Sequence, residues 1–238
     1  MFDFSQQIVL VAGASGNLGR AVTRAFHAAG ANLVLPDRAP DRLTQLFPEL
    51  TGASDHLLLN LVDAADPEAV ARVVSAALER FGRIDVLVNS VGGYRAGQPV
   101  HATLPETWDF ILNLNARVAF ILSRAVVPPM LAQGAGKIVH VAARAALSGV
   151  ANAAAYSASK AALVRLVESQ AEELKASNIN VNCVLPGTID TPQNRQAMPK
   201  ADFSRWVAPE AIADVILFLA SGAARAVQGA AVPVYGQS

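Results

Sequence analysis

Near the start of the chain stands the run Ile8-Val9-Leu10-Val11-Ala12-Gly13-Ala14-Ser15-Gly16-Asn17-Leu18-Gly19, from which the expected fold can be built outward. Its first five residues are apolar and partly β-branched, which is typical of a strand buried on both faces. A glycine-rich turn follows at once, and residues 20–29 are predicted to form a helix that ends at Gly30. A strand, a glycine turn and a helix in this order are the context that a dinucleotide-binding fingerprint requires.

The glycine turn therefore predicts a cofactor site. Glycines let the backbone approach a pyrophosphate, and the N-terminus of the following helix supplies amide donors and a favourable dipole. A glycine turn alone is weak evidence, but its place between strand and helix favours nucleotide binding over a plain turn. The residues predicted to contact the cofactor here are Gly13, Ser15, Gly16, Asn17, Leu18 and Gly19.

A second strand is predicted at residues 32–36, and Asp37 stands at its end. A carboxylate at this place accepts hydrogen bonds from the ribose hydroxyls of NAD and repels the 2′-phosphate of NADP. Arg38 acts in the opposite direction, because a guanidinium pairs with such a phosphate. We expect NAD(H) as the preferred cofactor and NADP(H) as the alternative. The competing interpretation is that Asp37 is a turn residue before a helix that begins at Asp41.

Strands and helices alternate along the rest of the chain. Asp66 is predicted to cap a helix, because Pro67 follows it at the first helical position. The alternation predicts an α/β fold, a single-domain Rossmann-like doubly wound parallel sheet with helices on both faces, over residues 1–238. Ligands of such sheets bind at the carboxyl ends of the strands. Further strands are predicted at 57–62, 84–89, 136–141, 179–185 and 230–235, and helices at 67–80, 105–131 and 209–221.

The composition excludes several classes of protein. Of 238 residues, 53% are hydrophobic and 16% are charged, so the chain is not intrinsically disordered. Lys plus Arg and Asp plus Glu number 19 each, which gives no reason to expect nucleic acid or an anionic membrane as a partner. The one cysteine, Cys183, is expected in a buried strand, and no metal site is expected. Neither a signal peptide nor an uninterrupted apolar run of membrane-spanning length is evident, so we expect a cytoplasmic protein.

The stretch Tyr156-Ser157-Ala158-Ser159-Lys160 lies in an alanine-rich run that predicts a helix. Residues four apart share a helix face, so the phenol and the ammonium are expected to point into the same space. A nearby cation favours the phenolate and lowers the pKa of tyrosine from about 10. Such a tyrosine can give or take a proton near neutral pH. A buried tyrosine beside a solvated lysine has the same spacing, so this pair alone is weak evidence.

Taken together, these stretches resemble the classical short-chain dehydrogenase/reductase (SDR) family, from Ile8 to about Gly236. The resemblance also covers Asn89-Ser90-Val91-Gly92, Asn113-Leu114-Asn115-Ala116 and Pro186-Gly187. It implies hydride transfer between a nicotinamide and a carbonyl or alcohol substrate. It implies Tyr156 as general acid/base, Lys160 on the nicotinamide ribose, and Asn115 as the residue that bends its helix and holds a relay water. The cofactor contacts that it implies beyond the glycine turn are Asp63, Asn89, Gly92, Tyr156, Lys160, Pro186, Gly187, Ile189 and Thr191.

The chain also departs from the family pattern. The family has a threonine where Ala12 stands, and its last strand ends in an aspartate and two glycines where this chain has Tyr235-Gly236-Gln237. The glycine spacing of the turn is closer to that of the family's extended members. The family places its catalytic serine 13 residues before the tyrosine, and that position is Ala143.

Three interpretations of Ala143 follow. The substrate is one that needs no serine, as in the quinonoid dihydropterin reductases, a branch of the family that keeps the tyrosine and lysine without it. Alternatively Ser148 or Arg144 stands in for the missing hydroxyl. In the third interpretation the chain has lost catalysis and is an NAD(P)-binding or regulatory protein, although the retention of Asn115, Tyr156 and Lys160 argues against it.

The sequence also indicates where a substrate would bind. The residues expected to line its pocket are Ala143, Arg144, Tyr94 and Trp206, with Arg95 beside them. The polar segment 191–206 is expected to act as a lid and hints at a polar or anionic substrate. His140 is expected to pack or hydrogen-bond rather than catalyse, and His101 to be solvated. A homo-oligomer, tetramer or dimer, is expected because the long helix through Asn115 and the helix after Tyr156 are apolar on more than one side.

Overall fold

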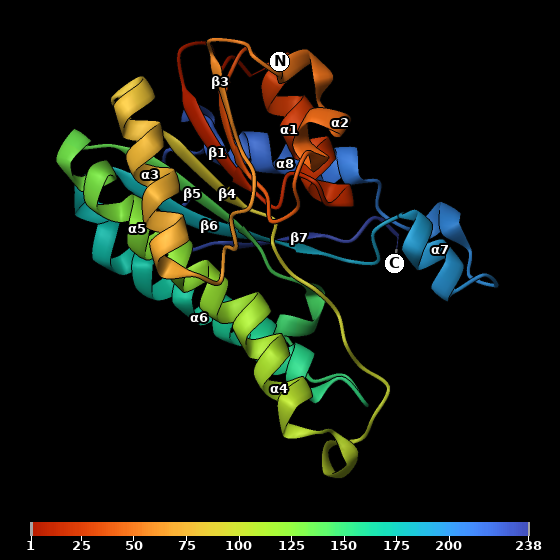
Figure 1. The fold of residues 1–238 in the computed structure, drawn as a ribbon. Helices are drawn as coiled ribbons and strands as arrows, with labels where there is room; N and C mark the ends of the chain where they lie inside the picture. Colours follow the sequence, from red (N-terminus) through yellow and green to blue (C-terminus); the bar gives the residue numbers. More distant parts are fainter. Residues whose placement is uncertain (1, 238) are drawn as a thin grey trace.

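The computed structural model describes residues 2–237, and its centre is a sheet of seven parallel strands (Figure 1). The strand order is β3-β2-β1-β4-β5-β6-β7, so it reverses between the neighbours β1 and β4. A reversal of this kind opens a crevice at the carboxyl ends of the strands. The predicted fold class is confirmed. The strands are β1 Ile8–Ala12, β2 Asn32–Pro36, β3 His56–Leu59, β4 Val86–Asn89, β5 Gly136–Val141, β6 Ile179–Pro186 and β7 Ala231–Val234.

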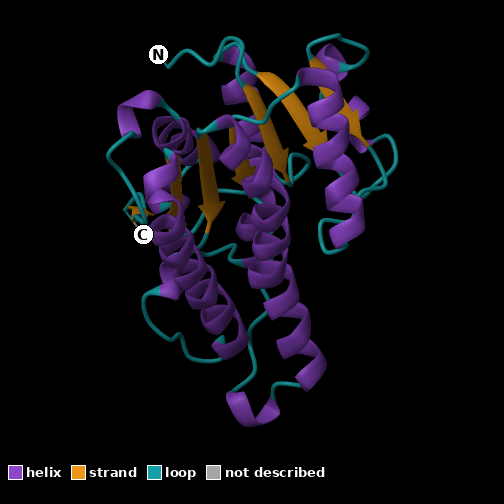
Figure 2. Ribbon diagram, turned by 90° about the vertical axis from the view of Figure 1, so that its left-hand side faces the viewer, coloured by secondary structure: helices purple, strands orange, loops and turns teal. Residues whose placement is uncertain are grey.

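Helices cover both faces of the sheet. Figure 2 shows three long helical columns side by side on one face, formed by α3, by α4 with α5, and by α6. Helices α1 and α8 pack against each other on the opposite face. The helices are α1 Asn17–Ala28, α2 Arg42–Leu46, α3 Pro67–Phe81, α4 Pro105–Leu112, α5 Val118–Gln133, α6 Ala154–Leu174, α7 Pro192–Ala197 and α8 Pro209–Ala220.

Alternation within the strands divides the core into two layers. In β1, Val9 and Val11 pack with α1 and α8, whereas Leu10 and Ala12 pack with α3, α5 and α6. Successive side chains of a strand point to opposite faces, so a strand covered on both sides needs an uninterrupted apolar run. This is why Ile8–Ala12 carries no polar residue and is buried throughout.

Several element boundaries differ from the predicted ones. The third strand ends at Leu59 rather than at residue 62, because Leu61 adopts the left-handed region with φ 59°. The first helix begins at Asn17 rather than Arg20, and the helix expected from Asp41 begins one residue later. The predicted helix 105–131 is interrupted by a π-helical turn, Asn113–Arg117, and continues to Gln133. The Asp66 cap is confirmed, since its carboxylate accepts a hydrogen bond from the Glu68 amide at 2.9 Å.

The stretch Pro105–Gln133 is long and apolar enough to cross a membrane by length and composition, with a hydropathy of 1.5 over its best window. The sequence predicted no apolar run of membrane-spanning length. One face of it packs in the core, because Ile121, Leu122 and Val126 are buried against the sheet, and 44% of the window is buried in all. In a helix packed in this way, length and composition alone are weak evidence for a membrane span.

Candidate active site

The glycine turn is shaped by close contacts that only glycine allows. Gly13 has φ 84°, and a Cβ atom on it would lie 2.8 Å from the Ser90 hydroxyl. A Cβ on Gly19 would lie 1.9 Å from the carbonyl oxygen of Gly13, so the first turn of α1 packs directly on the loop. Gly16 donates its amide to Gly13 at 3.0 Å and begins α1 without a side-chain cap. A bare helix N-terminus beside backbone that can be approached closely suits a pyrophosphate.

The other turn residues surround this loop. Ser15 is half-buried, Leu18 packs into the core, and Asn17 donates to the Gln193 side chain at 2.6 Å. This last bond joins the glycine turn to α7, which is 176 positions away in the chain. Sequence reasoning missed this link, because nothing in either local pattern signals it.

Asp37 lies at the carboxyl end of β2 and is 8% exposed. One of its carboxylate oxygens accepts a hydrogen bond from the Ala39 amide at 2.8 Å. This bond is what the turn interpretation predicts, and a carboxylate has further lone pairs for a ribose. Arg38 is exposed beside it. Asp63 shows the same pattern, because its carboxylate accepts from the Ala65 amide at 2.9 Å.

A buried polar chain runs across the ends of β4 and β5. Asn89 lies 3.2 Å from one ring nitrogen of His140, and the Ser123 hydroxyl lies 3.1 Å from the other. Burial first and Lys160 second lower the pKa of His140 to about 3, so the imidazole stays neutral. His140 is therefore a hydrogen-bonded core residue, as expected. Ser90, next to Asn89, donates its hydroxyl to the Ala12 carbonyl at 2.8 Å.

Asn115 holds the loop after β4 in place. Its side-chain amide accepts from the Gly93 N–H at 3.0 Å and donates to the Gly93 carbonyl at 3.0 Å. The same amide nitrogen donates to the Ser159 hydroxyl of α6, also at 3.0 Å. The amide lies in the π-helical turn and is fully buried. One side chain thus joins the central helix, the β4 loop and α6, and π-turns of this kind often mark functional sites.

Gly92 fits closely between Asn115 and Lys160. A Cβ on Gly92 would lie 2.9 Å from the Asn115 side-chain oxygen and 3.2 Å from the Lys160 ammonium. The ammonium itself donates to the Val141 carbonyl at 2.8 Å. Burial lowers the pKa of Lys160 to about 8.

The expected lowering of the Tyr156 pKa is wrong for this structure. Tyr156 and Lys160 both lie near the start of α6, as predicted. However, burial first and Tyr94 second raise the pKa of Tyr156 to about 12. The lysine ammonium is directed at Val141 instead, so desolvation of the phenol dominates.

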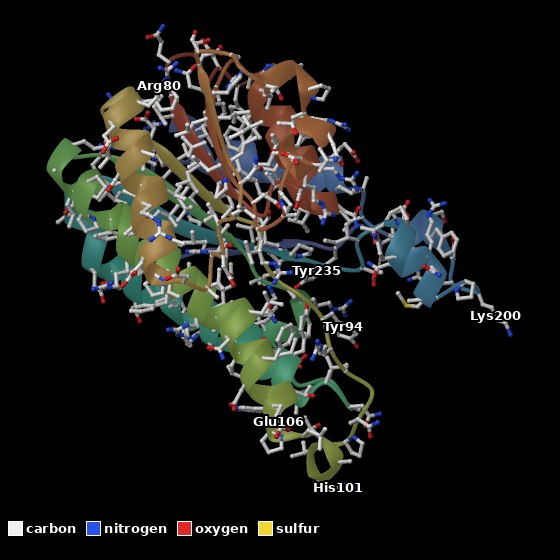
Figure 3. All side chains as sticks on the ribbon, viewed as in Figure 1. Arg80, Tyr94, His101, Glu106, Lys200 and Tyr235 are labelled. Carbon is white, nitrogen blue, oxygen red and sulfur yellow. The ribbon has the colours of Figure 1, made fainter. Side chains whose placement is uncertain are left out.

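Ala143 follows β5 in an extended backbone, with φ −166° and ψ 160°, and is 7% exposed. The guanidinium of Arg144 lies over the Tyr235 ring, 5.2 Å from its centroid. Ser148 is exposed on the loop before α6. Figure 3 places Tyr94 and Tyr235 near the ends of the strands and His101 at the far tip of the 3₁₀ turn Val100–Ala102.

The segment after β6 forms a separate lobe. Pro186 ends β6 opposite Val234, and the Gly187 amide donates to the Val234 carbonyl at 3.1 Å. Ile189 pairs with Val207 in a parallel bridge. Thr191 caps α7 by accepting from the Asn194 amide at 3.2 Å, so this hydroxyl already has a partner.

Charges and aromatic rings hold the outer part of this lobe. Asp190 accepts two hydrogen bonds from Arg195, at 2.6 and 2.7 Å. Trp206 packs on Phe203, with ring centroids 4.8 Å apart, and Figure 3 shows Lys200 at the outer end of the lobe. The structure thus places Trp206 in the lobe's own aromatic pair, and not among the residues that line the cavity described next.

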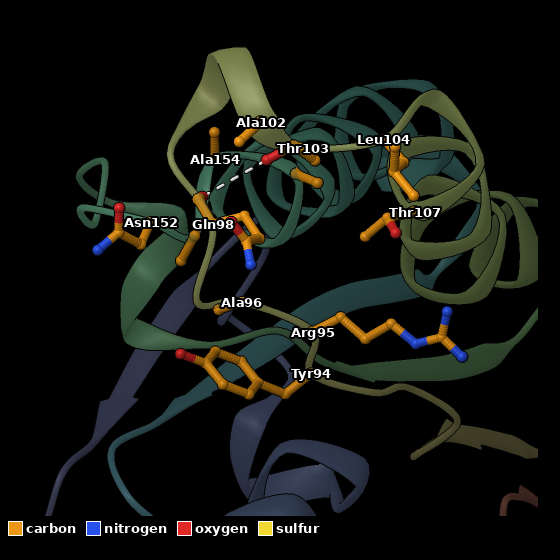
Figure 4. Close-up of a pocket in the computed structure, with 12 residues that line it drawn as sticks. Tyr94, Arg95, Ala96, Gln98, Ala102, Thr103, Leu104, Thr107, Asn152 and Ala154 are labelled. Carbon is orange, nitrogen blue, oxygen red and sulfur yellow. Dashed lines mark hydrogen bonds between the residues drawn. The ribbon is translucent and has the colours of Figure 1, made fainter.

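A cavity of about 650 Å³ opens beside the start of α6 (Figure 4). Tyr94 lies at its edge, and its ring meets the Tyr156 ring edge-on, with centroids 4.8 Å apart and planes at 80°. Arg95 extends in the opposite direction from the same loop and stacks on Phe110, 3.9 Å from the ring centroid. The size is that of a small-molecule site. The cavity is lined by Tyr94, Arg95, Ala96, Gln98, Ala102, Thr103, Leu104, Thr107, Asn152, Ala153, Ala154 and Ala155.

Among residues 2–237, no group of three or more His, Cys, Asp or Glu side chains is placed to hold a metal ion. The polar groups at the carboxyl ends of the strands suit an organic ligand. The tight glycine turn, the bare start of α1 and the buried Lys160 fit a dinucleotide.

The fold and this arrangement define an α/β oxidoreductase of the dinucleotide-binding type. The family model described as "short chain dehydrogenase" matches residues 7–202, and the chain belongs to this family, whose members bind NAD(P). It is 32% identical over 238 residues to a 3-oxoacyl-[acyl-carrier-protein] reductase of Thermotoga maritima, covering 97% of this chain and 96% of the relative. It is 30% identical over 247 residues to a 7alpha-hydroxysteroid dehydrogenase of Bacteroides fragilis, covering 99% and 95%.

A solved structure carries the same fold. The crystal structure of a putative NAD(P)-dependent gluconate 5-dehydrogenase from Beutenbergia cavernae, with NADP bound at low occupancy, is 31% identical. The match covers 99% of this chain and 97% of that one, with a TM-score of 0.88. The named substrates of these relatives differ, so the comparisons identify an oxidoreductase and leave its substrate open.

Proposed function

We propose that this chain catalyses NAD(P)-dependent hydride transfer between nicotinamide and a carbonyl or alcohol, with Tyr156 as general acid/base. The observation that carries the proposal is that Gly92 fits closely between the Asn115 side chain and the Lys160 ammonium, while Tyr156 lies one helical turn before Lys160 on α6. The cavity of about 650 Å³ begins beside this group and offers room for a small substrate. Bound nicotinamide would supply or accept the hydride, and the protein would supply position and the proton.

The raised pKa of Tyr156 favours the reductive direction. With a pKa of about 12 the phenol is protonated at neutral pH, which is the form that donates a proton to a carbonyl oxygen as it gains negative charge. Oxidation of an alcohol needs the phenolate and is therefore expected to accelerate as the pH rises. General acid catalysis by one positioned group contributes roughly 10²–10⁴-fold.

Lys160 and Asn115 have supporting roles in this proposal. The Lys160 ammonium, held by the Val141 carbonyl, would donate to the nicotinamide ribose and place the ring against the substrate. Asn115 fixes the loop after β4 relative to α6, because it is hydrogen-bonded to Gly93 in that loop and to Ser159 on α6. A shift of about 1 Å in such a group can lower the rate about 10²-fold, so the hydrogen bonds of Asn115 contribute to the rate by holding the site in place.

The residues around the adenine half of the cofactor are proposed to make the site bind NAD(H) more tightly than NADP(H). Asp37 directly follows β2 and is buried, so a 2′-phosphate beside it would meet a desolvated carboxylate. Arg38 is exposed next to it and would reduce the discrimination. Asp63 would face the adenine, and Ile189 and Thr191 the carboxamide.

Ala143 is proposed to stand where the family has its catalytic serine. It lies two residues after the end of β5 and at the start of the turn that leads to α6. A methyl group cannot donate to the substrate oxygen, and the loss of one preorganised donor lowers rates by about 10²–10³-fold.

We also propose a homo-oligomer. Phe120 and Leu131 lie on α5 and are 50% and 46% exposed. They are three helical turns apart and therefore share a face. Two large apolar side chains on one exposed helix face favour cover by a second copy of the chain.

The test measures cofactor binding and turnover separately. NADH and NADPH are titrated by fluorescence, and a panel of carbonyl substrates is then assayed with both. Tyr156→Phe is expected to abolish turnover and leave NADH affinity within about threefold, since the lost hydroxyl acts on the substrate. A parent that binds neither cofactor, or a Tyr156→Phe variant with unchanged turnover, would refute the proposed function.

A further inference from the structure

Tyr94 lies between the cavity and the reactive phenol. It lines the cavity of about 650 Å³ and packs its ring edge-on against Tyr156 (Figure 4). Tyr94 is also 66% exposed, so a ligand can reach it. A substrate that enters the cavity and approaches Tyr156 therefore meets the Tyr94 phenol on its way.

The loop that carries Tyr94 is fixed on both sides of this residue. On one side, Gly93 is bonded through both its N–H and its carbonyl to the buried Asn115 amide. On the other side, the Gly97 amide donates to the Asn152 carbonyl just before α6, at 2.8 Å. An exposed side chain on a loop anchored in this way keeps its position, which a hydrogen-bond donor to a substrate requires.

The other candidate donors near Tyr156 are less well placed. Ala143 carries no hydroxyl. Ser148 and Arg144 are not among the residues that line the cavity, and the Arg144 guanidinium lies over the Tyr235 ring. Tyr94, by contrast, lines the cavity, is in ring contact with Tyr156 and brings a phenolic O–H, which is a hydrogen-bond donor.

We propose that Tyr94 is a second substrate-contacting phenol, which donates a hydrogen bond to the same oxygen that Tyr156 protonates and so takes the place of the hydroxyl missing at Ala143. The inference rests on the proposed function. In reduction the hydride forms the new C–H bond at the carbonyl carbon, and the Tyr156 proton goes to the oxygen. Tyr94 keeps its own proton and stabilises the charge on that oxygen.

Tyr94→Phe tests the hydroxyl alone, because it keeps the ring on Tyr156. We expect kcat for a carbonyl substrate to fall by about 10²-fold while NADH affinity is unchanged, since the lost bond acts on the developing oxyanion. Adding Ala143→Ser to Tyr94→Phe is expected to recover at least about tenfold of the lost kcat, because a hydroxyl returns beside the same oxygen. A merely structural role of Tyr94 would give no such rescue.

Tyr235→Phe is the matched control, as it removes the hydroxyl of another tyrosine outside the cavity, and its kcat is expected to equal that of the parent. If Tyr94→Phe keeps the parent kcat while Tyr156→Phe abolishes turnover, the inference is overturned and the proposed function stands. A loss in Tyr94→Phe that Ala143→Ser does not rescue also overturns it. A parent without turnover on any carbonyl overturns the proposed function, and the inference with it.

Discussion

The ammonium of Lys160 donates its hydrogen bond to the carbonyl oxygen of Val141, 2.8 Å away at the end of β5. The side chain is 5% exposed and its pKa is lowered to about 8, mainly by burial. A buried ammonium with one carbonyl partner is held at the expense of stability, which is typical of groups retained for function. This relationship gives the first prediction.

Lys160→Met is predicted to change how stability depends on pH. Between pH 8 and the ordinary lysine value of 10.5, the unfolded chain binds the Lys160 proton and the folded chain has released it, so this group makes the parent more stable as the pH rises. Below pH 8 the buried charge costs up to about 3 kcal/mol. The free energy of unfolding, measured with urea, should therefore be higher for the variant than for the parent at pH 7. At pH 10 this difference should be lost. A difference that is constant with pH would contradict the buried charge.

Gly92→Ala is predicted to destabilise the protein by roughly 1–3 kcal/mol, because the new methyl would press on Asn115 and Lys160. The nearest atom, the Asn115 side-chain oxygen, would lie at 2.9 Å and is itself held by the Gly93 amide. Gly149→Ala is the matched control, since no atom lies within 4 Å of a Cβ there. Thermal and urea unfolding of the two variants provide the comparison. Equal stability of the two variants would contradict the close fit of Gly92 between Asn115 and Lys160.

The sequence predicted what local patterns determine. Ile8–Ala12, the glycine turn and α1 follow from apolar periodicity and from backbone that only glycine can adopt. Asp37, Asn89 and Ala143 each lie at or just after the carboxyl end of a strand. They share one edge of the sheet, because the carboxyl ends of parallel strands lie together.

The rest depends on contacts between distant segments. Asn115 bonds to Gly93 and Ser159, which lie 22 and 44 positions away, and nothing in the local sequence of any of them signals this. The direction of the Tyr156 pKa shift was wrong for the same reason. Helical spacing predicted a neighbouring cation, but the degree of burial and the contact with Tyr94 appear only in the folded chain.

Asp37→Ala is predicted to erode or reverse a preference for NADH over NADPH. The carboxylate repels a 2′-phosphate, and its removal leaves Arg38 to attract one. Fluorescence titration of both cofactors against the parent and the variant measures the ratio of their dissociation constants. Because Asp37 also accepts from the Ala39 amide, Asp37→Asn serves as the control that can keep this bond without the charge. Equal affinities for the two cofactors in the parent would count against the assignment.

Phe120→Glu is predicted to shift the protein to a smaller assembly. The charge would stand on the α5 face that Phe120 shares with Leu131, and burying it against a second copy is unfavourable. Light scattering at micromolar concentration measures the mass, with Leu61→Glu as control, because Leu61 is 73% exposed on a loop after β3. A parent with the mass of one chain would refute the homo-oligomer.

Ala143→Ser in the parent separates the interpretations of the missing hydroxyl. The extended backbone at this position accepts a serine without strain, so the variant is expected to fold. If Tyr94 already donates to the substrate oxygen, the added hydroxyl should change kcat for a ketone by less than about tenfold, whereas a site that lacks any donor should gain roughly 10²–10³-fold. Steady-state kinetics on a simple ketone and on a quinonoid substrate measure both cases.

A quinonoid substrate that the parent reduces faster than any ketone, with no change on Ala143→Ser, would favour a reaction that needs no second donor. A large gain on the ketone would instead show that no other residue of the parent supplies the bond.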